Sequence, residues 1–224
     1  EAARLLELAG ARVGAVAESG AELAPGRAIL EAMGSAGALH CGWKVAQTLV
    51  EYASGIATAA RRIVEAARAA RPDIPVVCTR KNVPGAKAVA IKAILAGGAT
   101  PHRLGLSETI LIFAEHRAFL DRESASETIA RTRRAAPEKK IVVEVSSLEE
   151  ALTWAAAGAD VIQTEKFSVD DLSALSLRLT ASGYGTLVAA AGGINAGNAA
   201  AYAAAGADIL VTSAPYSAPP LDVA

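Results

Sequence analysis

The chain has 224 residues and a formal net charge of −1, and 52% of its residues are hydrophobic. This length is enough to bury one large core, or one core and a small second domain. The near-neutral charge argues against a nucleic-acid partner, which needs a basic surface, and each long apolar run is interrupted by a charge, Gly or Pro, which argues against a membrane span.

The first part of the chain mixes helical and extended patterns. Residues 2–10 have a helical pattern, whereas residues 11–17 and 26–34 resemble two strands with Gly and Pro turn signals between them. The chain begins in mid-pattern without a methionine, so we expect residues to be missing before Glu1.

Cysteine usage bears on location. Cys41 and Cys78 are the only cysteines, so there is no disulfide framework and a cytoplasmic location is expected. Cys78 ends the apolar run "IPVVC", where a small buried hydrophobic side chain is the expected role.

The pattern changes at residue 42, where a long amphipathic helix is predicted over residues 42–70. Strands and helices then alternate. The predicted strands cover residues 74–79, 109–113, 139–145, 159–164, 186–192 and 207–214. The predicted helices between them cover residues 84–98, 124–136, 147–158, 168–183 and 195–206. These strands are rich in Val and Ile without polar alternation, which indicates a parallel sheet covered on both faces.

Two units are near copies of each other: "AAAGADVIQT" (residues 155–164) and "AAAGADILVT" (residues 203–212). In each, a helix ends on a Gly that can adopt the left-handed conformation, and an Asp precedes the next strand. Repeated units of one size favour a barrel over an open doubly wound sheet. In both architectures the functional groups lie at the C-terminal ends of the strands.

The strand ends carry chemically useful groups. In chain order they are Thr79, Arg80 and Lys81, then Glu115 and His116, Glu144, Glu165 and Lys166, Gly192 and Gly193 with Asn195, and finally Thr212 and Ser213; His102 and Arg103 follow a helix. Guanidinium groups and a lysine suit an organic acid. Paired carboxylates suit Mg²⁺ or sugar hydroxyls, and a glycine turn suits a phosphate. Together they predict a site where a phosphorylated sugar meets an organic anion.

Plainer roles stay open for several of these residues. A "GGI" turn before a helix is more often structural than phosphate-binding. His102 fits a structural histidine equally well, and Glu165 with Lys166 fits a surface pair. A charge inside a strand is costly, so Glu144 is more readily explained by function.

The segment "TRKNVPGAKAVAIKAILAGGATPHRLGLSETILIFAEH", with "VEVSSLEEALTWAAAGADVIQTEKFS" and "AAGGINAGNAAAYAAAGAD", resembles the quinolinate phosphoribosyltransferase family over essentially the whole chain. The stretches "HCGWKVAQTLVEYASGIAT" and "TSAPYSAPPLDV" are similar to a branch of that family associated with molybdenum transport genes.

The resemblance implies an α/β fold in which an N-terminal α/β sandwich, truncated here, packs on an open parallel α/β barrel. Residues 1–43 would belong to the sandwich, residues 44–213 would form the barrel, and the chain end (about 214–224) would return to the sandwich. It also implies a homodimer with shared active sites. Lys44 aligns with an arginine that the family borrows from the partner chain.

The family joins phosphoribosyl pyrophosphate to a pyridine dicarboxylate, releases pyrophosphate and carbon dioxide, and needs Mg²⁺. Carried over position by position, the resemblance implies roles for the strand-end residues. The acid would be bound by Arg80, Lys81, His102 and Arg103, with Lys44 and Lys166 as further cations. Lys81, Glu144 and Glu165 would carry catalysis, and the two glutamates would hold the ribose hydroxyls and Mg²⁺. Gly192, Gly193 and Ser213 would bind the phosphate.

The departures from the family pattern cluster at this site. The family lysine of "IKDNH" is Phe113 here, its asparagine is Glu115, and an asparagine elsewhere is Lys166. Smaller changes place Val142, Ala191 and Ser213 at family Glu, Ser and Gly positions. These changes predict a retained phosphoribosyl half and an altered acceptor half that takes a different small carboxylic acid.

Two other functions remain as alternatives. Authentic quinolinate phosphoribosyltransferase activity in NAD biosynthesis is disfavoured by Phe113, because a second carboxylate would be buried without its cation. A non-catalytic sensor of an oxyanion, a nucleotide or a molybdopterin-type metabolite is disfavoured by Glu144 and Glu165, which an anion sensor does not need.

Overall fold

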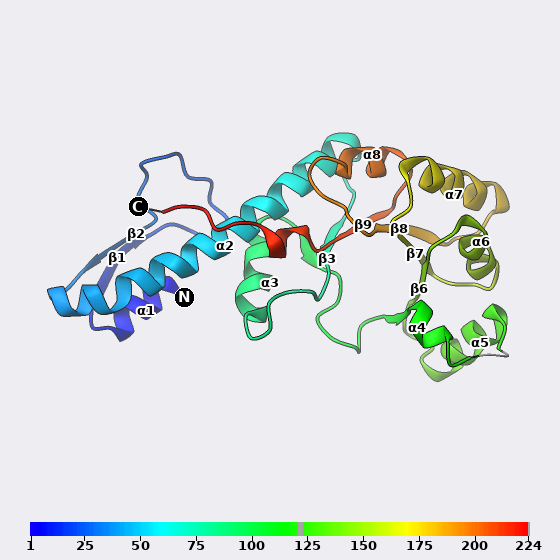
Figure 1. Cartoon of the computed structure of the whole chain (residues 1–224), viewed down its shortest axis with the longest axis horizontal. Helices are drawn as coiled ribbons and strands as arrows, with labels where there is room; N and C mark the ends of the chain where they lie inside the picture. The colour runs from blue at the N-terminus through cyan, green and yellow to red at the C-terminus, as the bar shows by residue number, and fades with distance from the viewer. Residues whose placement is uncertain (121–122, 224) are drawn as a thin grey trace. The chain divides into compact units, whose positions relative to one another are not determined.

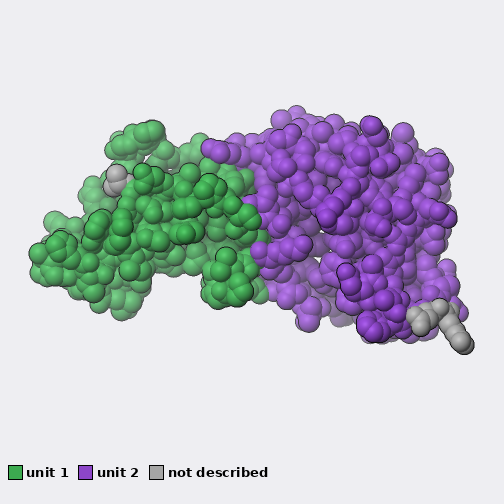
Figure 2. Space-filling view, in the orientation of Figure 1, with its two compact units in different colours: residues 1–61, 82–98, 215–224 green, residues 62–81, 99–214 purple. Residues whose placement is uncertain are grey.

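The structure is a computed structural model that describes residues 1–120 and 123–223. Two compact units divide the chain (Figure 2). Unit 1 comprises Glu1–Arg61, Asn82–Gly98 and Pro215–Ala224, and unit 2 comprises Arg62–Lys81 and Ala99–Ala214. The domain boundaries inferred from the family resemblance stay a prediction, because compactness alone does not define a folding domain.

Unit 1 pairs a small sheet with helices. Helix α1 (Ala2–Leu8) precedes the antiparallel strands β1 (Arg12–Val16) and β2 (Leu30–Met33). The long helix α2 (Ala36–Ala70) begins six residues before the predicted start, because Gly42 is accommodated against Leu6 and Ala9 instead of ending the helix.

Close backbone approaches hold the other segments of unit 1 to α2. A Cβ on Gly55 would lie 2.2 Å from Pro219 O, and one on Gly97, at the end of helix α3 (Lys87–Ala96), would lie 2.4 Å from Ala57 O. The N–H of Leu221 donates to Glu51 O over 3.0 Å. Glycine is therefore required at both contacts.

Unit 2 is built on a seven-stranded parallel sheet with the order β4-β3-β9-β8-β7-β6-β5 (Figure 1). The strands are β3 (Val76–Cys78), β4 (Thr100–Pro101), β5 (Ile110–Ile112), β6 (Ile141–Val145), β7 (Val161–Glu165), β8 (Leu187–Ala191) and β9 (Ile209–Thr212). The six predicted strands are confirmed. The two-residue strand β4 was not predicted, because it is too short to show a pattern. The edge strands β4 and β5 are not paired with each other, so the barrel is open, as the resemblance implied.

Helices cover the sheet in chain order. They are α4 (Ala114–Arg117), α5 (Ala125–Ala135), α6 (Leu148–Ala156), α7 (Val169–Ser182) and α8 (Ala199–Ala204), followed by a 3₁₀ turn, η1 (Ala214–Ser217). Contacts run from α5 to α6, from α6 to α7 and from α7 to α8, which gives one layer of neighbouring helices (Figure 1). Ser124, Ser147 and Ser168 accept a backbone N–H at the starts of α5, α6 and α7.

The two near-copy sequences, residues 155–164 and 203–212, have the same turn between helix and strand. Gly158 and Gly206 have φ of 94° and 104°, as predicted for residues that follow a helix end. Each following Asp accepts a backbone N–H from a neighbouring strand: Asp160 Oδ2 from Ile141 over 2.8 Å, and Asp208 Oδ2 from Val188 over 2.9 Å. The repeated Asp thus joins adjacent strands where they begin.

Side chains alternate between the two faces of the strands. Leu111, Val142, Val161, Ala189, Ala191 and Val211 form one buried cluster, with Val77, Phe113 and Ile209 packed against it. Among the described residues, no helix combines the length and apolarity that a bilayer crossing requires. Both cysteines are free thiols, and burial raises the pKa of Cys78 to about 12, as expected for a buried apolar role.

Candidate active site

The C-terminal ends of the unit 2 strands line a cavity of about 520 Å³, a volume typical of small-ligand sites. Ten of the predicted site residues line it: Arg80, Lys81, His102, Arg103, Glu144, Glu165, Lys166, Gly192, Gly193 and Ser213. These ten residues come from six strand ends, which a parallel barrel brings together. Their individual roles stay predictions.

Lys44 does not line this cavity. It belongs to α2 in unit 1, where its Nζ lies 3.1 Å from Gln47 Oε1 and 5.0 Å from the centre of the Trp43 ring. Its predicted contribution to a partner's site stays a prediction.

One wall of the cavity is cationic. The N–H of Thr79 donates to Thr212 O over 2.9 Å, and the N–H of His102 donates to Cys78 O over 2.8 Å. These bonds place Arg80, Lys81, His102 and Arg103 on adjoining strand ends. Burial and the Arg103 charge lower the pKa of His102, although Glu108 opposes them. The ring is thus biased towards its neutral form.

Two glutamates supply the negatively charged groups of the cavity. Glu144 on β6 accepts a hydrogen bond from Gln163 Nε2 over 2.7 Å. Burial raises the pKa of Glu144; the Gln163 hydrogen bond and Lys81 oppose this, while Glu165 and Glu115 add to it. Glu165 ends β7, with its Oε1 3.9 Å from Lys166 Nζ. Two carboxylates thus line the cavity. The lysines nearby, Lys81 for Glu144 and Lys166 for Glu165, offset their negative charge only in part.

A glycine turn follows β8. Gly192 and Gly193 have φ of 83° and 102°, and the amides of Asn195 and Asn198 donate to Gly193 O over 3.0 and 3.1 Å. Helix α8 begins at Ala199, four residues later than predicted, because these asparagines form a turn first. The turn is therefore fixed by its own side chains.

An apolar patch completes the lining. Leu111, Phe113, Ala191 and Val211 all contribute to it. Phe113 takes the position where the family resemblance places a lysine, so this part of the cavity has no charge of its own.

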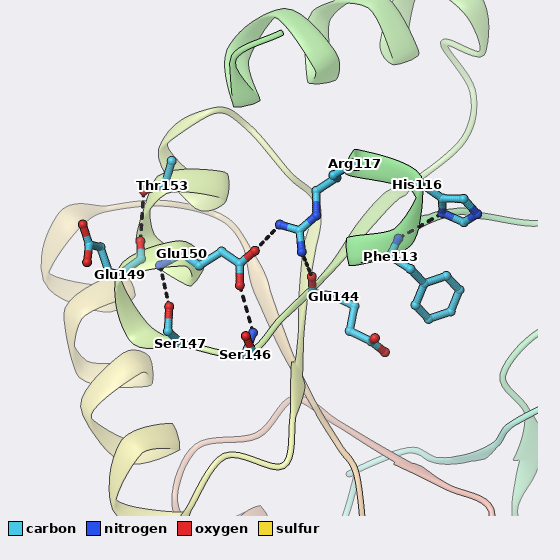
Figure 3. A network of polar contacts seen from close by, with 9 residues as sticks. All are labelled: Phe113, His116, Arg117, Glu144, Ser146, Ser147, Glu149, Glu150 and Thr153. Carbon is cyan, nitrogen blue, oxygen red and sulfur yellow. Dashed lines mark hydrogen bonds and ion pairs between the residues drawn. The ribbon is translucent and has the colours of Figure 1, made fainter. Parts of the chain in front are cut away.

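The Phe113 segment is anchored by Arg117 (Figure 3). Its guanidinium pairs with Glu150 and donates to Glu144 O over 3.1 Å. It also lies 5.5 Å from the centre of the Trp154 ring. His116 Nδ1 accepts the N–H of Phe113 over 3.1 Å, so His116, a strand-end candidate, secures the turn and is absent from the cavity lining. The Phe113 ring and the Glu144 carboxylate lie on the side of this network away from Glu150 (Figure 3).

The sequence reasoning missed one polar residue of the cavity. Gln163 is only 4% exposed and lies on β7, two residues before Glu165. The signal that could have identified it is its amide, because Gln is mostly exposed in folded proteins and this one stands in the apolar strand "DVIQT".

Comparisons with known proteins agree on one family. Residues 56–224 match the family model described as "Quinolinate phosphoribosyl transferase, C-terminal domain". "Putative pyrophosphorylase ModD" of Rhodobacter capsulatus is 50% identical over 200 residues, which cover 89% of this chain and 77% of that protein. Human "Nicotinate-nucleotide pyrophosphorylase [carboxylating]" is 35% identical over 80% of this chain and 60% of its own length. The solved structure of NadC from Streptococcus pyogenes has a TM-score of 0.86 at 28% identity, over 99% of this chain and 77% of that chain.

Proposed function

The chain belongs to the quinolinate phosphoribosyltransferase family, and from this premise we propose that it transfers phosphoribosyl from phosphoribosyl pyrophosphate to a small carboxylic acid with release of pyrophosphate. One observation carries the proposal. A single cavity in unit 2 combines the wall formed by Arg80, Lys81, His102 and Arg103 with two glutamates and a glycine turn. Each of the three groups matches one part of the two substrates.

The cationic wall binds the acid. Arg80 and Arg103 can hold a carboxylate through paired N–H groups, and Lys81 adds a point charge beside them. His102 gains its proton as the anion arrives, because the anion offsets the burial and the Arg103 charge that lower its pKa.

Glu144 and Glu165 act on the sugar. As the bond from the anomeric carbon to pyrophosphate breaks, positive charge develops on the ribose ring, and fixed carboxylates stabilise it. The departing oxygen keeps the electron pair of the broken bond, and a new bond forms from the anomeric carbon to the acceptor. The backbone N–H groups of the Gly192–Gly193 turn are placed for the 5′-phosphate.

Mg²⁺ is the cofactor we propose. Among the described residues, no group of three or more His, Cys, Asp or Glu side chains could hold a metal ion by itself. Two glutamates fit Mg²⁺ all the same, because this ion usually takes one or two carboxylates and completes its shell with water and substrate phosphates. Glu144 and Glu165 would hold it, and it would offset charge on the pyrophosphate oxygens.

We also propose a homodimer in the cytoplasm. Val45 and Tyr52 lie two turns apart on one face of α2 and are 59% and 56% exposed. An apolar helix face of this kind is suited to a second copy of the chain, with Lys44 beside it as the cation offered to the partner. The free thiols Cys41 and Cys78 fit a reducing compartment.

The test is pyrophosphate release from phosphoribosyl pyrophosphate and Mg²⁺ across a panel of small carboxylic acids, quinolinate included. Release with an acid other than quinolinate supports the altered acceptor half. Release with quinolinate alone assigns the chain to NAD biosynthesis and contradicts the altered acceptor. The absence of release with any acid, alongside tight binding of phosphoribosyl pyrophosphate, favours a sensor and contradicts the proposal.

Variants connect the assay to the cavity. Glu165→Gln keeps the size of the side chain and removes the charge, so we expect transfer to fall by at least about 100-fold. Glu149→Gln is the matched control, because Glu149 lies in the first turn of α6 and does not line the cavity. Equal activity of the two variants contradicts a catalytic role for Glu165.

A further inference from the structure

The end of β6 that carries Glu144 has no strand partner on the side of β5. Strand β5 ends at Ile112, which pairs with Val143, so Glu144 lies one residue beyond the last pair. Carbonyl directions alternate along a strand. Because Lys140 O accepts the N–H of Ile110 on β5, the carbonyl of Glu144, four residues later, points to the same side. It needs a donor that β5 does not supply.

Arg117 supplies that donor. Its Nη2 donates to Glu144 O over 3.1 Å. Arg117 belongs to α4, the short helix that directly follows β5, so its guanidinium takes the place that a longer β5 would have filled. The side chain of Arg117 thus does for Glu144 what the neighbouring strand does for the earlier residues of β6.

Glu150 fixes the position of this guanidinium. Its Oε1 pairs with Arg117 Nη1, and the side chains of Arg117 and Glu150 are only 18% and 26% exposed. The Trp154 ring, one turn further along α6, lies 5.5 Å from the guanidinium. Glu150 Oε2 accepts the N–H of Ser146 over 2.9 Å. The ion pair therefore holds the end of β6 at two points, Glu144 O and Ser146 N (Figure 3).

The Glu144 carboxylate lines the cavity, whereas Arg117 and Glu150 do not. Figure 3 shows the carboxylate on the side away from Glu150, while the carbonyl of the same residue meets Arg117. A displacement of this backbone moves the carboxylate with it, and transfer rates fall steeply when a catalytic group is misplaced by about 1 Å. On the basis of the proposed function, we propose that Arg117 is a positioning residue, which holds the backbone of Glu144 so that its carboxylate meets the ribose.

A similar ion pair at the start of β6 provides a matched control. Arg133 Nη2 donates to Asp160 Oδ2 over 3.1 Å, and the same oxygen accepts the N–H of Ile141, the first residue of β6. Neither Arg133 nor Asp160 lines the cavity. Both pairs hold a backbone group of β6, but only the Arg117 pair lies at the end that carries Glu144.

Arg117→Lys keeps the charge beside Glu150 but offers one nitrogen where the guanidinium offers two, so the contact with Glu144 O is lost. With the acid that the panel assay identifies, we expect kcat to fall about tenfold and the KM for phosphoribosyl pyrophosphate to rise only about threefold. The larger effect falls on kcat because the carboxylate matters most as positive charge develops on the ribose.

Arg133→Lys should leave kcat within about twofold of the unaltered chain. Glu150→Gln loosens the same contact without altering Arg117, and it should lower kcat in the same direction as Arg117→Lys. Equal losses in Arg117→Lys and Arg133→Lys, or an unchanged kcat in Arg117→Lys or Glu150→Gln, overturn the proposal.

A double-mutant cycle asks whether Arg117 acts through Glu144. Glu144→Gln removes the charge that Arg117 positions, so the addition of Arg117→Lys should lower kcat by no more than about a further twofold. Losses that multiply would assign Arg117 a general structural role, which overturns the proposal. An effect of Arg117→Lys confined to the KM for the acid would assign it to the Phe113 side of the cavity, and this also overturns it.

Calorimetric binding of phosphoribosyl pyrophosphate with Mg²⁺ repeats the cycle without turnover. We expect Arg117→Lys to weaken binding about threefold in the unaltered chain and to have no effect in Glu144→Gln. This coupling, without pyrophosphate release from any acid, refutes the proposed function and leaves the positioning role standing. Release by the unaltered chain that Arg117→Lys does not change leaves the function intact and refutes the positioning role.

Discussion

Gly192 lies against the backbone of Lys166 so closely that a Cβ on Gly192 would come 2.5 Å from Lys166 N. The same Cβ would come 2.9 Å from Glu165 Cδ. The N–H of Lys166 donates to Ala191 O over 2.9 Å, which holds the end of β7 to the end of β8. The glycine turn proposed to bind phosphate therefore packs directly against Glu165, the carboxylate proposed to bind ribose. This close packing is possible because Gly192 has no side chain.

Gly192→Ala should therefore disrupt this unit, whereas Gly193→Ala should only strain the backbone. Both residues have positive φ, but a Cβ on Gly193 would meet nothing within 4 Å. We expect Gly193→Ala to lower the free energy of unfolding by about 1–2 kcal/mol, and Gly192→Ala to lower it by at least about 2 kcal/mol more because of the clash. Urea denaturation of the two variants checks this, and equal losses would contradict the close packing.

Lys166 itself has φ of 58°, the one positive φ among the described residues other than glycine. Lys166→Gly should relieve this conformation and raise the free energy of unfolding by up to about 1 kcal/mol, offset in part by the flexibility of glycine in the unfolded chain. Lys166→Ala removes the same charge without relieving the backbone, so it is the matched control. Thermal unfolding compares the two.

The same pair of variants tests the charge. The family resemblance places a lysine at the position of Phe113. If the Lys166 ammonium replaces that lysine, both variants should raise the KM for the acid by about tenfold. Unchanged kinetics in Lys166→Ala would remove Lys166 from acid binding.

His102 should take up a proton when an anion binds. Burial and Arg103 lower its pKa, against the opposing effect of Glu108, and a bound carboxylate would raise it again. Acid binding measured by calorimetry near pH 6.5 in two buffers of different ionisation enthalpy should show this uptake. His102→Asn should abolish it. Uptake that persists in the variant would assign the proton to another group.

The same lowered pKa bears on stability. Because the unfolded chain binds the His102 proton more readily than the folded chain does, stability from this residue is present above the ordinary histidine pKa. It is lost as the pH falls through the lower folded value. Acid unfolding of His102→Asn should accordingly begin at a lower pH than that of the unaltered chain. An unchanged midpoint would contradict the lowered pKa.

Asp160 joins the starts of two strands, and its removal should be costly. Burial raises its pKa, but the N–H of Ile141 and the charge of Arg133 outweigh burial and hold the pKa below its ordinary value. Asp160→Ala leaves the Ile141 N–H without an acceptor, so we expect a loss of about 1–3 kcal/mol in the free energy of unfolding. Asp208→Ala, which frees Val188 N–H, should behave alike.

The Asp160 effect should depend on pH. A carboxylate with a lowered pKa contributes stability above its unfolded pKa, and this contribution disappears as the pH falls through the folded value. The difference between the unaltered chain and Asp160→Ala should therefore shrink in acid. A difference that is constant from neutral pH into acid would show that packing, and not charge, is what Asp160 contributes.

The sequence by itself determined the parallel sheet and most of the cavity. Runs of Val and Ile without alternation, the near-copy "AAAGAD" units and the glycines after the helices are local signals. In a parallel barrel the C-terminal ends of all strands meet at one end. Arg80, Glu144, Glu165 and Gly192 therefore had to come together once the strands were recognised.

Only the tertiary structure decided which of these groups touch. Strand order placed β3 between β4 and β9, although these strands are far apart in the chain. Register then set Gln163 beside Glu144 and Glu165 beside Ala191. The hydrogen bond between Gln163 and Glu144, the tight approach of Gly192 to Lys166, and the contacts of Arg117 with Glu144 and Glu150 all depend on distances of a few ångströms between segments remote in sequence. No local pattern encodes such distances, because they are set by how the whole sheet packs.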